Sequence, residues 1–354
     1  MTQAVEQIAA FIRFRQVPEG IFSYEFLPGR DAYWPEEQNW IRQAATTWAL
    51  ALHARVSQEK ASARACAQAI GAFEKMIKPL PGVSGAQFVA TPDDKHALGT
   101  TALIVLALID SPERDRHAGL RRSLLEAIAS LQRYDGGFRT AFPPAPSTGS
   151  QDYYPGEALL AIVRHYELDP DVRWRDLCDK SLLFYQDYFR QERPPMFVPW
   201  QSQAWGHLAR QTRLRKYAEF VFEMSDQIAA TAIAWSDPTL PIYNGGFDVH
   251  GDGSPGVSTA VYVEGLVEAI RTAEAFGEKE YAARYREATK NAARFVLQLC
   301  WRSEECYYVR TPKNVLGGVR NTMISPTLRI DNMQHGLAAF MGVLEVDAVE
   351  KPIK

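Results

Sequence analysis

Residues 96–108 read HALGTTALIVLAL, a segment rich in alanine, glycine and leucine that would be apolar on nearly every side of a helix. A helix without a polar face must be covered all round, so this segment predicts an inner helix. Five more segments of this kind follow the same pattern: RQAATTWALAL (42–52), YYPGEALLAIV (153–163), WQSQAWGHLA (200–209), STAVYVEGLVEAI (258–270) and DNMQHGLAAFM (331–341).

Longer segments with charges along one face alternate with these inner segments and predict amphipathic outer helices. They span residues 2–15, 57–78, 118–134, 174–190, 213–230 and 279–300. We aligned the inner segments on the small or polar residue that opens each apolar run: Ala45, Gly99, Gly156, Gln203, Thr259 and Gln334. The resulting intervals are 54, 57, 47, 56 and 75 residues. Such a period indicates an array of helical hairpins.

Six hairpins that close on themselves predict an all-α fold, an (α/α)6 toroid with six inner and six outer helices. One such domain would account for all 354 residues. We expect the last ten residues, EVDAVEKPIK, to be frayed because they are charged and terminal. Short β-like loops bearing glycine and aromatic residues should connect each outer helix to the next inner one. The clearest are GIFSYEF (20–26), DGGFRTAF (135–142), NGGFDVHG (244–251) and LGGVRNTMI (316–324).

These loops should lie on one rim, at the N-terminal ends of the inner helices, and form the binding face. In each inner segment, the residue three positions before the aligned one should lie at the mouth of the central bore. Together these six residues predict a ring. Its members are Arg42, His96, Tyr153, Trp200, Gly256 and Asp331. Aromatic rings that stack on a sugar and charged groups that fix its hydroxyls suit a saccharide site. The alternative is that these residues are helix caps and packing aromatics.

Composition and charge exclude several classes of partner. The chain has 39 basic and 42 acidic residues, a net charge of −3, so no strong positive field would hold a nucleic acid or an anionic membrane. The first residues, MTQAVEQIAAFIRFRQ, do not resemble a signal peptide, and no run approaches the roughly 18 apolar residues of a membrane span. The four cysteines form no C-x-x-C motif. We therefore predict a cytoplasmic protein with reduced thiols.

No cofactor or metal is expected. The sequence contains no Walker loop, no dinucleotide-binding fingerprint after a strand and no G-x-S-x-G elbow. The segment DVHGDG (248–253) has neither the length nor the closing glutamate of a calcium loop. In the same rim segment, Tyr243, Asp248 and His250 are candidates for a loop that closes over a substrate.

The six-hairpin arrangement, with DGGF-like turns and inner segments such as YYPGEALLAI and STAVYVEGL, resembles the (α/α)6-toroid carbohydrate enzymes. These include six-hairpin glycosidases, N-acylglucosamine 2-epimerases and the catalytic part of glucuronyl C5-epimerases. The resemblance implies a saccharide or uronic-acid-like ligand. A narrower similarity joins LQRYDGGF (131–138) to the repeat of terpene cyclases and protein prenyltransferases, in which these residues tie helices together. It implies the alternative of an isoprenoid-binding toroid, although no D-x-D-D motif is present.

Five residues are candidates for acid–base catalysis. In DYYPGEA, Glu157 lies in the first helical turn, where it could either cap the helix or act as an acid beside Asp152, Tyr153 and Tyr154. Glu264 lies in a segment predicted to be buried, which would raise its pKa, unless it turns outward to tie two helices.

Asp331 and His335 are four residues apart and should share one helical face, so the carboxylate could orient the imidazole. Asp331 could equally cap the helix. Arg329 would suit a carboxylate or hydroxyls of the ligand.

Two reactions follow, and we rank hydrolysis of a glycosidic bond first. There, Glu157 or Asp152 would protonate the leaving oxygen, while Asp331 or Glu264 would activate water or attack. In an epimerase, His335 backed by Asp331 would remove a proton from carbon, and His250 or His96 would return it. A non-catalytic carbohydrate or protein receptor is the third alternative.

Overall fold

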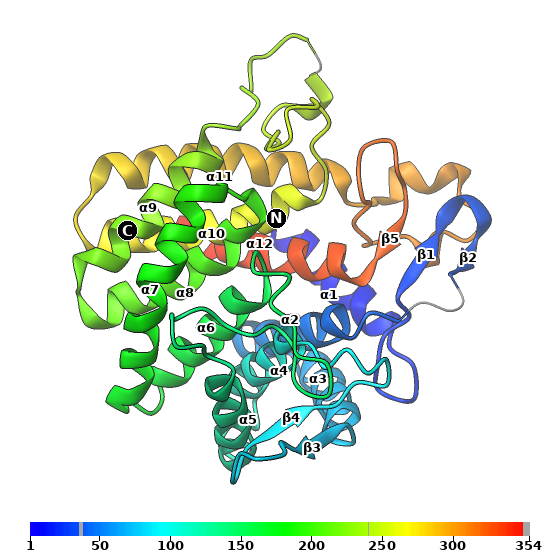
Figure 1. Ribbon diagram of the computed structural model, residues 1–354. Coiled ribbons are helices and arrows are strands. Elements are labelled where there is room, and N and C mark those ends of the chain that lie inside the picture. Colours follow the sequence, from blue (N-terminus) through cyan, green and yellow to red (C-terminus); the bar gives the residue numbers. More distant parts are fainter. Residues whose placement is uncertain (35–37, 240, 350–354) are drawn as a thin grey trace.

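The six apolar segments all form helices, and these helices make a closed inner ring. The computed structural model describes residues 1–34, 38–239 and 241–349. Each inner helix packs on the next, and the last packs on the first (Figure 1). In ring order they are α2 (Trp40–Ser57), α4 (Leu98–Asp110), α6 (Tyr154–Tyr166), α8 (Val198–Thr212), α10 (Ser258–Ala275) and α12 (Ile330–Val349). Every residue of α4 is buried, as its sequence predicts.

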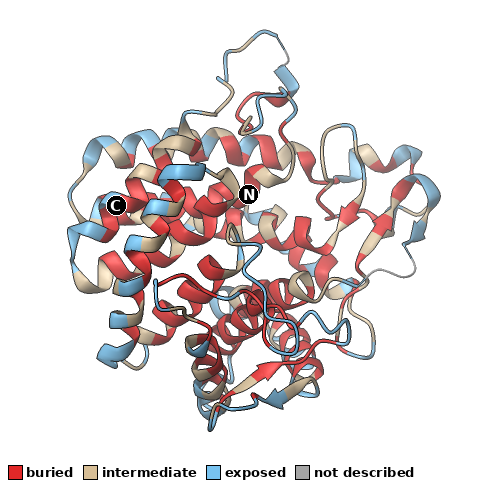
Figure 2. Ribbon diagram, viewed as in Figure 1, coloured by how far each residue is buried: buried red, intermediate tan, exposed pale blue. Residues whose placement is uncertain are grey.

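The amphipathic segments form the outer helices. They are α1 (Thr2–Phe14), α3 (Lys60–Glu74), α5 (Ala118–Ser130), α7 (Val172–Glu192), α9 (Arg215–Ala229) and α11 (Lys279–Leu299). Each of the last five outer helices packs on the inner helix that precedes it in the chain. Helix α1 packs on α12, and this contact makes the sixth pair. Figure 2 shows buried inner helices and outer helices with an exposed side. The predicted all-α (α/α)6 toroid is confirmed.

Short strands occur only at the rim among the described residues. An antiparallel sheet of order β2-β1-β5 joins β1 (Glu25–Leu27) to β2 (Ala32–Tyr33) and to β5 (Leu328–Arg329), with Phe26 opposite both Tyr33 and Leu328. A second pair joins β3 (Ile77–Pro79) and β4 (Gln87–Val89), with Ile77 opposite Val89. The β1–β5 pairing links the first and last rim loops across the closure of the ring.

Short 3-10 turns complete the rim and the connections. They are η1 (Pro28–Arg30), η2 (Pro195–Phe197), η3 (Pro241–Tyr243), η4 (Ser303–Tyr308) and η5 (Pro312–Asn314). The predicted rim loops each add an antiparallel bridge to the end of the preceding outer helix: Gln16 with Phe22, Gln132 with Phe138, Ala232 with Phe247 and Cys300 with Val319.

The rim turns also fasten neighbouring outer helices. Gln132 donates from Nε2 to the Leu177 carbonyl (2.8 Å) and to Ser181 Oγ (2.8 Å), so it ties α5 to α7. The next turn places Gly136 at φ +93°, where a Cβ would overlap the Lys180 carbonyl. Gly20, Gly245 and Gly317 repeat this approach to the following outer helix. The LQRYDGGF segment is therefore a structural tie, as its narrower resemblance implied.

Gly136→Ala is expected to destabilise the protein through two effects. A left-handed backbone costs an alanine about 1–2 kcal/mol. The overlap with the Lys180 carbonyl adds about 1–3 kcal/mol. Gly277→Ala is a matched control, because Gly277 has φ +75° but nothing within 4 Å of its added Cβ. Urea unfolding followed by circular dichroism would measure both. Equal losses in the two variants would contradict a tight approach at Gly136.

Other sequence predictions have mixed outcomes. Helix α12 continues to Val349, and Glu345 pairs with Arg271 (2.6 Å). Residues 350–354 lie outside the described residues, so fraying of the last ten residues stays a prediction. The four cysteines are buried free thiols. No helix among the described residues is long and apolar enough to cross a membrane. The single-domain organisation and the cytoplasmic location stay predictions.

Candidate functional site

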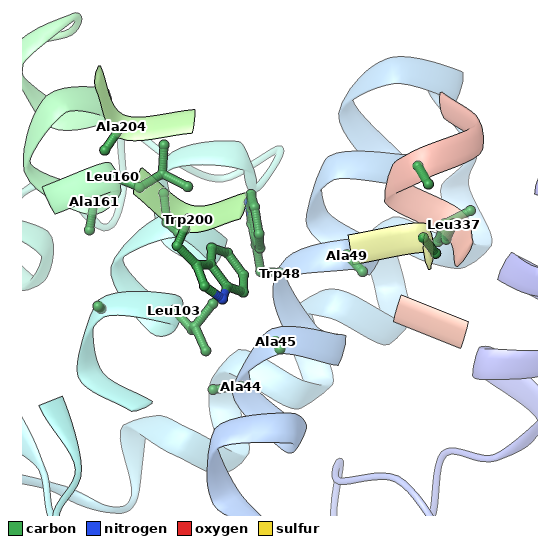
Figure 3. Packing of buried hydrophobic residues seen from close by; sticks show 14 of the residues in the cluster. Ala44, Ala45, Trp48, Ala49, Leu103, Leu160, Ala161, Trp200, Ala204 and Leu337 are labelled. Atoms are coloured by element: carbon green, nitrogen blue, oxygen red, sulfur yellow. The ribbon is translucent and has the colours of Figure 1, made fainter. Parts of the chain in front are cut away.

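Two tryptophans from opposite walls of the ring meet in the bore. The rings of Trp48 on α2 and Trp200 on α8 lie 6.0 Å apart, surrounded by small alanines and by Leu103 (Figure 3). One cavity lies on each side of this pair. The front cavity, of about 490 Å³, includes Trp200 and lies at the N-terminal ends of the inner helices. The back cavity, of about 410 Å³, includes Trp48 and lies at their C-terminal ends.

The back cavity is rich in charge, but its arginines already have partners. Arg164 pairs with Asp110 (2.9 Å), Arg210 pairs with Glu268, and Arg271 pairs with Glu345 (2.6 Å). These groups hold the C-terminal ends of the inner helices together. The front cavity has long rim loops and chemical groups without partners, so we take it as the candidate site.

Most of the predicted site residues line the front cavity. Five of the six ring positions do so: Arg42, Tyr153, Trp200, Gly256 and Asp331. Tyr154, Glu157, Arg329 and His335 also contribute to its wall. Five positions predicted from the alignment of the inner segments therefore line one cavity. Sequence reasoning missed Asn39, Ser150, Asn321, Thr322 and Gln334, polar residues near the N-terminal ends of the inner helices or in rim loops that also line the cavity.

Glu157 is a buried acid on α6. Its residue is 3% exposed, and Oε2 has no hydrogen-bond partner among the described residues. Burial raises the pKa of Glu157 to about 8. Gly99 on α4 makes room for this carboxyl, because a Cβ at that position would overlap Glu157 Oε2. Below that pKa the group is a neutral carboxylic acid in the cavity wall, able to donate a proton.

The buried acid should also make stability depend on pH. The folded pKa of about 8 lies above the ordinary glutamate value of 4.5 that holds in the unfolded chain, so Glu157 is neutral in both states below about pH 4.5. As pH rises from there towards 8, the unfolded state loses its proton first and the folded state becomes less stable. Glu157→Gln lacks this loss and should be more stable than the wild type by a few kcal/mol near pH 8.

Urea unfolding of both proteins near pH 5 and near pH 8 would measure this difference. The advantage of Glu157→Gln should grow with pH. A difference that is the same at both pH values would contradict a neutral buried Glu157.

His335 is held by a carboxylate from the neighbouring helix. Its Nδ1 lies 2.7 Å from Glu264 Oε1, which joins α12 to α10. Burial raises the pKa of Glu264, and His335 partly offsets the rise. When Glu264 is ionised, its carboxylate only accepts, so Nδ1 carries the proton and Nε2 keeps a free lone pair. The Gln334 amide also lies 3.2 Å from Nδ1. No described residue bonds to Nε2. The imidazole can therefore act as a base in the front cavity.

Asp331 does not play the part predicted for it beside His335. Its carboxylate pairs with Arg42 Nε (3.1 Å) and with Arg329 Nη2 (3.0 Å). Two guanidinium groups from α2 and β5 engage Asp331 at the start of its helix, while the buried Glu264 bonds to the imidazole. The predicted partnership was therefore wrong. Arg42, which also contacts Tyr24, and Arg329 instead form a charged cluster on the wall.

Six predicted residues do not line the front cavity. Glu264 lines the back cavity and reaches the front cavity only through its bond to His335. Asp152 accepts a hydrogen bond from Tyr188 Oη (2.6 Å), and the buried His96 ring packs against Phe88. The remaining three belong to the rim segment before α10: Tyr243 is buried on η3, Asp248 accepts from the backbone of its own loop, and His250 is exposed. Closure of this loop over a substrate stays a prediction.

In the part of the chain that the structure describes, no three histidine, cysteine, aspartate or glutamate side chains gather as a metal site would require.

Comparisons with known proteins show similarity of structure. No family model and no curated protein matches the sequence. Solved structures that match over almost their whole length include a mannanase, an epimerase and an isomerase. The GH76A α-1,6-mannanase from Salegentibacter sp. HEL1_6 has a TM-score of 0.66 at 10% identity, covering 97% of this chain and 99% of its own. The cellobiose 2-epimerase from Bacillus thermoamylovorans B4167 has a TM-score of 0.66 at 12% identity, covering 96% of this chain and 99% of its own.

A D-mannose isomerase has a TM-score of 0.64 at 14% identity, covering 98% of this chain and 97% of its own. Identities this low show the fold alone. The chain therefore shares the (α/α)6-toroid fold with these three proteins.

Proposed function

We propose that the protein is a saccharide isomerase or epimerase that moves a proton at the carbon beside the reducing-end carbonyl. The observation that carries the proposal is the pair of proton carriers in the front cavity: neutral Glu157 on α6 and His335, held by Glu264, on α12. These two helices are three places apart in the ring of six, so they belong to opposite walls. A ligand between them would have an acid on one side and a base on the other.

The chemistry follows from these two groups. His335 Nε2 removes the proton from C2 of the open-chain sugar, and the electron pair of the C–H bond moves into an enediolate. For epimerisation, Glu157 delivers its proton to the opposite face of C2 as the C1 carbonyl re-forms. For isomerisation, Glu157 protonates the C1 carbonyl oxygen, protonated His335 returns its proton to C1, and the O2 hydroxyl gives its proton to the Glu157 carboxylate as the C2 carbonyl forms. Arg42 and Arg329 can bind the oxygens that gain negative charge, and the Trp200 ring offers an apolar surface for the sugar.

Three considerations support a saccharide as the ligand. The wall combines aromatic rings with charged and amide side chains. The structural neighbours include a D-mannose isomerase and a cellobiose 2-epimerase. An isoprenoid site, the alternative drawn from the narrower resemblance, would have an apolar bore with few carboxylates, whereas Glu157 and Asp331 line this cavity.

Glycoside hydrolysis is the second candidate, because Glu157 and Asp331 are two carboxyl groups on one cavity and a mannanase shares the fold. The geometry changes the order of preference given by the sequence. Asp331 is engaged by two guanidinium groups, whereas the Nε2 atom of His335 is free. Proton transfer at carbon therefore becomes the first proposal.

Incubation in D2O followed by proton NMR separates the candidates. The sugars are glucose, mannose, fructose, glucuronate, cellobiose and α-1,6-mannobiose. Loss of the C2 proton signal with formation of an epimer or ketose is the expected result. Release of free mannose or glucose from a disaccharide would favour hydrolysis. Melting temperatures measured with the same sugars provide the third outcome. A sugar that raises the melting temperature of the protein but is not converted would indicate a receptor.

A further inference from the structure

A second cavity adjoins the front cavity at the mouth of the toroid. This side cavity has a volume of about 400 Å³ and lies beside α2 and α4. It shares four wall residues with the front cavity: Asn39, Ile41, Ser150 and Tyr154. The two cavities are therefore neighbouring compartments of one mouth, of similar size, with the Tyr154 side chain bordering both.

The wall of the side cavity offers hydrogen-bonding groups of both kinds. Hydroxyl and carboxylate side chains come from Thr91, Asp93, Thr140 and Ser147. The Lys95 ammonium group also lines the cavity and makes no hydrogen bond or ion pair with a described residue. In addition, Thr100 is 1% exposed, borders the cavity and has a hydroxyl without a partner. Thr91 and Asp93 bond to each other, whereas the Lys95 ammonium group and the Thr100 hydroxyl have no partner in the described part of the chain. Polar groups of this kind around a concavity suit a ligand with several hydroxyl groups.

Backbone strain is concentrated at the same place. Seven non-glycine residues among those described have positive φ. Four of them end helices, where this conformation is common: Asp31, Gln58, Arg193 and Arg213. The other three are Asp94 (φ +55°), His96 (φ +42°) and Ser150 (φ +54°).

All three strained residues belong to the side cavity or its loop. Asp94 and Ser150 line the cavity, and His96 lies between the lining residues Lys95 and Ala97. Such conformations cost about 1–3 kcal/mol each and cluster where a loop must hold a ligand. The loop is also braced from within, because Asp93 Oδ1 accepts from Thr91 Oγ1 (2.6 Å) and from the Lys95 backbone (3.3 Å).

We propose that the side cavity binds a second sugar ring, so that the substrate is a disaccharide or longer saccharide whose reducing-end ring occupies the front cavity. This inference rests on the proposed function and narrows its substrate class. The front cavity holds the ring that reacts, next to Glu157 and His335. The side cavity holds the neighbouring ring through its hydroxyls and contributes to affinity without touching the reacting carbon.

Titration calorimetry with four sugars tests the proposal by binding, without a need for turnover. Glucose and mannose are the single rings, and cellobiose and α-1,6-mannobiose are the double rings. At least one disaccharide should bind the wild type about tenfold more tightly than its monosaccharide. Ala145→Trp fills the side cavity from an exposed position that does not line the front cavity. It should weaken that disaccharide about tenfold and leave the monosaccharide within about twofold.

Two further variants complete the design. Ala118→Trp makes the same substitution at an exposed site outside both cavities, and should change neither affinity. Lys95→Ala removes a charged wall group without adding bulk, and should weaken the disaccharide selectively even if Ala145→Trp fails to fold. Melting temperatures identify any variant that is unfolded.

The failures of the two proposals are distinguishable. If monosaccharides bind but no disaccharide binds more tightly, or if neither Ala145→Trp nor Lys95→Ala weakens the disaccharide selectively, the second-ring proposal is overturned while the proposed function stands. If none of the four sugars binds, both proposals fall.

Discussion

Glu157→Gln is expected to lower kcat by about 10²- to 10⁴-fold on the saccharide that the D2O experiment identifies. The amide has nearly the shape of the neutral acid, so it should keep the sugar in place, and KM should change little. The amide cannot donate the proton that a protonated carboxyl supplies. The same reasoning predicts that wild-type kcat falls as pH rises through about 8, because burial holds the pKa of Glu157 there. Steady-state kinetics across this pH range would measure both effects.

Asp152→Asn is the matched control. The sequence offers Asp152 as an alternative acid five residues earlier, but the structure bonds it to Tyr188 Oη and away from the front cavity. Its kcat should stay close to that of the wild type. Nearly full turnover in Glu157→Gln, together with a large loss in Asp152→Asn, would reverse the assignment of the acid. Nearly full turnover in both would remove a carboxylic acid from the mechanism.

Asp110→Ala should reduce the free energy of unfolding by about 3–5 kcal/mol, because it removes a buried carboxylate that pairs with two guanidinium groups and leaves the buried Arg164 with Glu167 alone (3.0 Å). Asp110 ends α4, and its side chain is fully buried. It accepts from Trp48 Nε1 (2.8 Å), Arg55 Nε (2.9 Å) and Arg164 Nη2 (2.9 Å), so one carboxylate connects α2, α4 and α6.

The charge state of Asp110 supports this expectation at neutral pH. Burial by itself would raise the pKa of Asp110, but Arg164 and Arg55 outweigh it and hold the pKa below its usual value. A carboxyl with a lowered folded pKa stabilises the protein above its unfolded pKa and loses that contribution as pH falls through the folded value. The loss in free energy of unfolding caused by Asp110→Ala should therefore be at its full size near pH 7 and become smaller at acidic pH.

Asp115→Ala provides the comparison for Asp110→Ala. The Asp115 side chain is 95% exposed and contacts only Arg114, so its loss should change stability by less than about 1 kcal/mol. Urea unfolding at neutral pH would measure both variants. Similar small losses in the two would mean that the inner helices do not depend on the buried carboxylate.

The sequence alone determined the architecture. Apolar residues on every side of a segment require a covered helix, and charges along one face require an exposed one. Both properties are local, so they can be read from the chain without knowing its neighbours. The regular spacing of the inner segments then predicted a closed ring of hairpins, and the ring alignment placed Arg42, Tyr153, Trp200 and Asp331 at one mouth, where the structure finds them.

The sequence also singled out Glu157 as a candidate acid, through its place near the start of an apolar helix. It could not determine whether that carboxyl caps the helix or faces a cavity. Three-dimensional packing decided this: the missing side chain of Gly99, on another helix, opens the space that the carboxyl occupies.

Only the tertiary structure decided which groups meet between helices. His335 bonds to Glu264, 71 residues away in the chain, and Asp331 pairs with Arg42 on α2. His96 satisfies the same sequence alignment but packs on Phe88 instead of facing the bore. Local periodicity states which face of a helix is apolar, whereas contacts between helices depend on the rotation and tilt at which two surfaces pack. The His335–Glu264 pair, the charged cluster and the side cavity all belong to that second level.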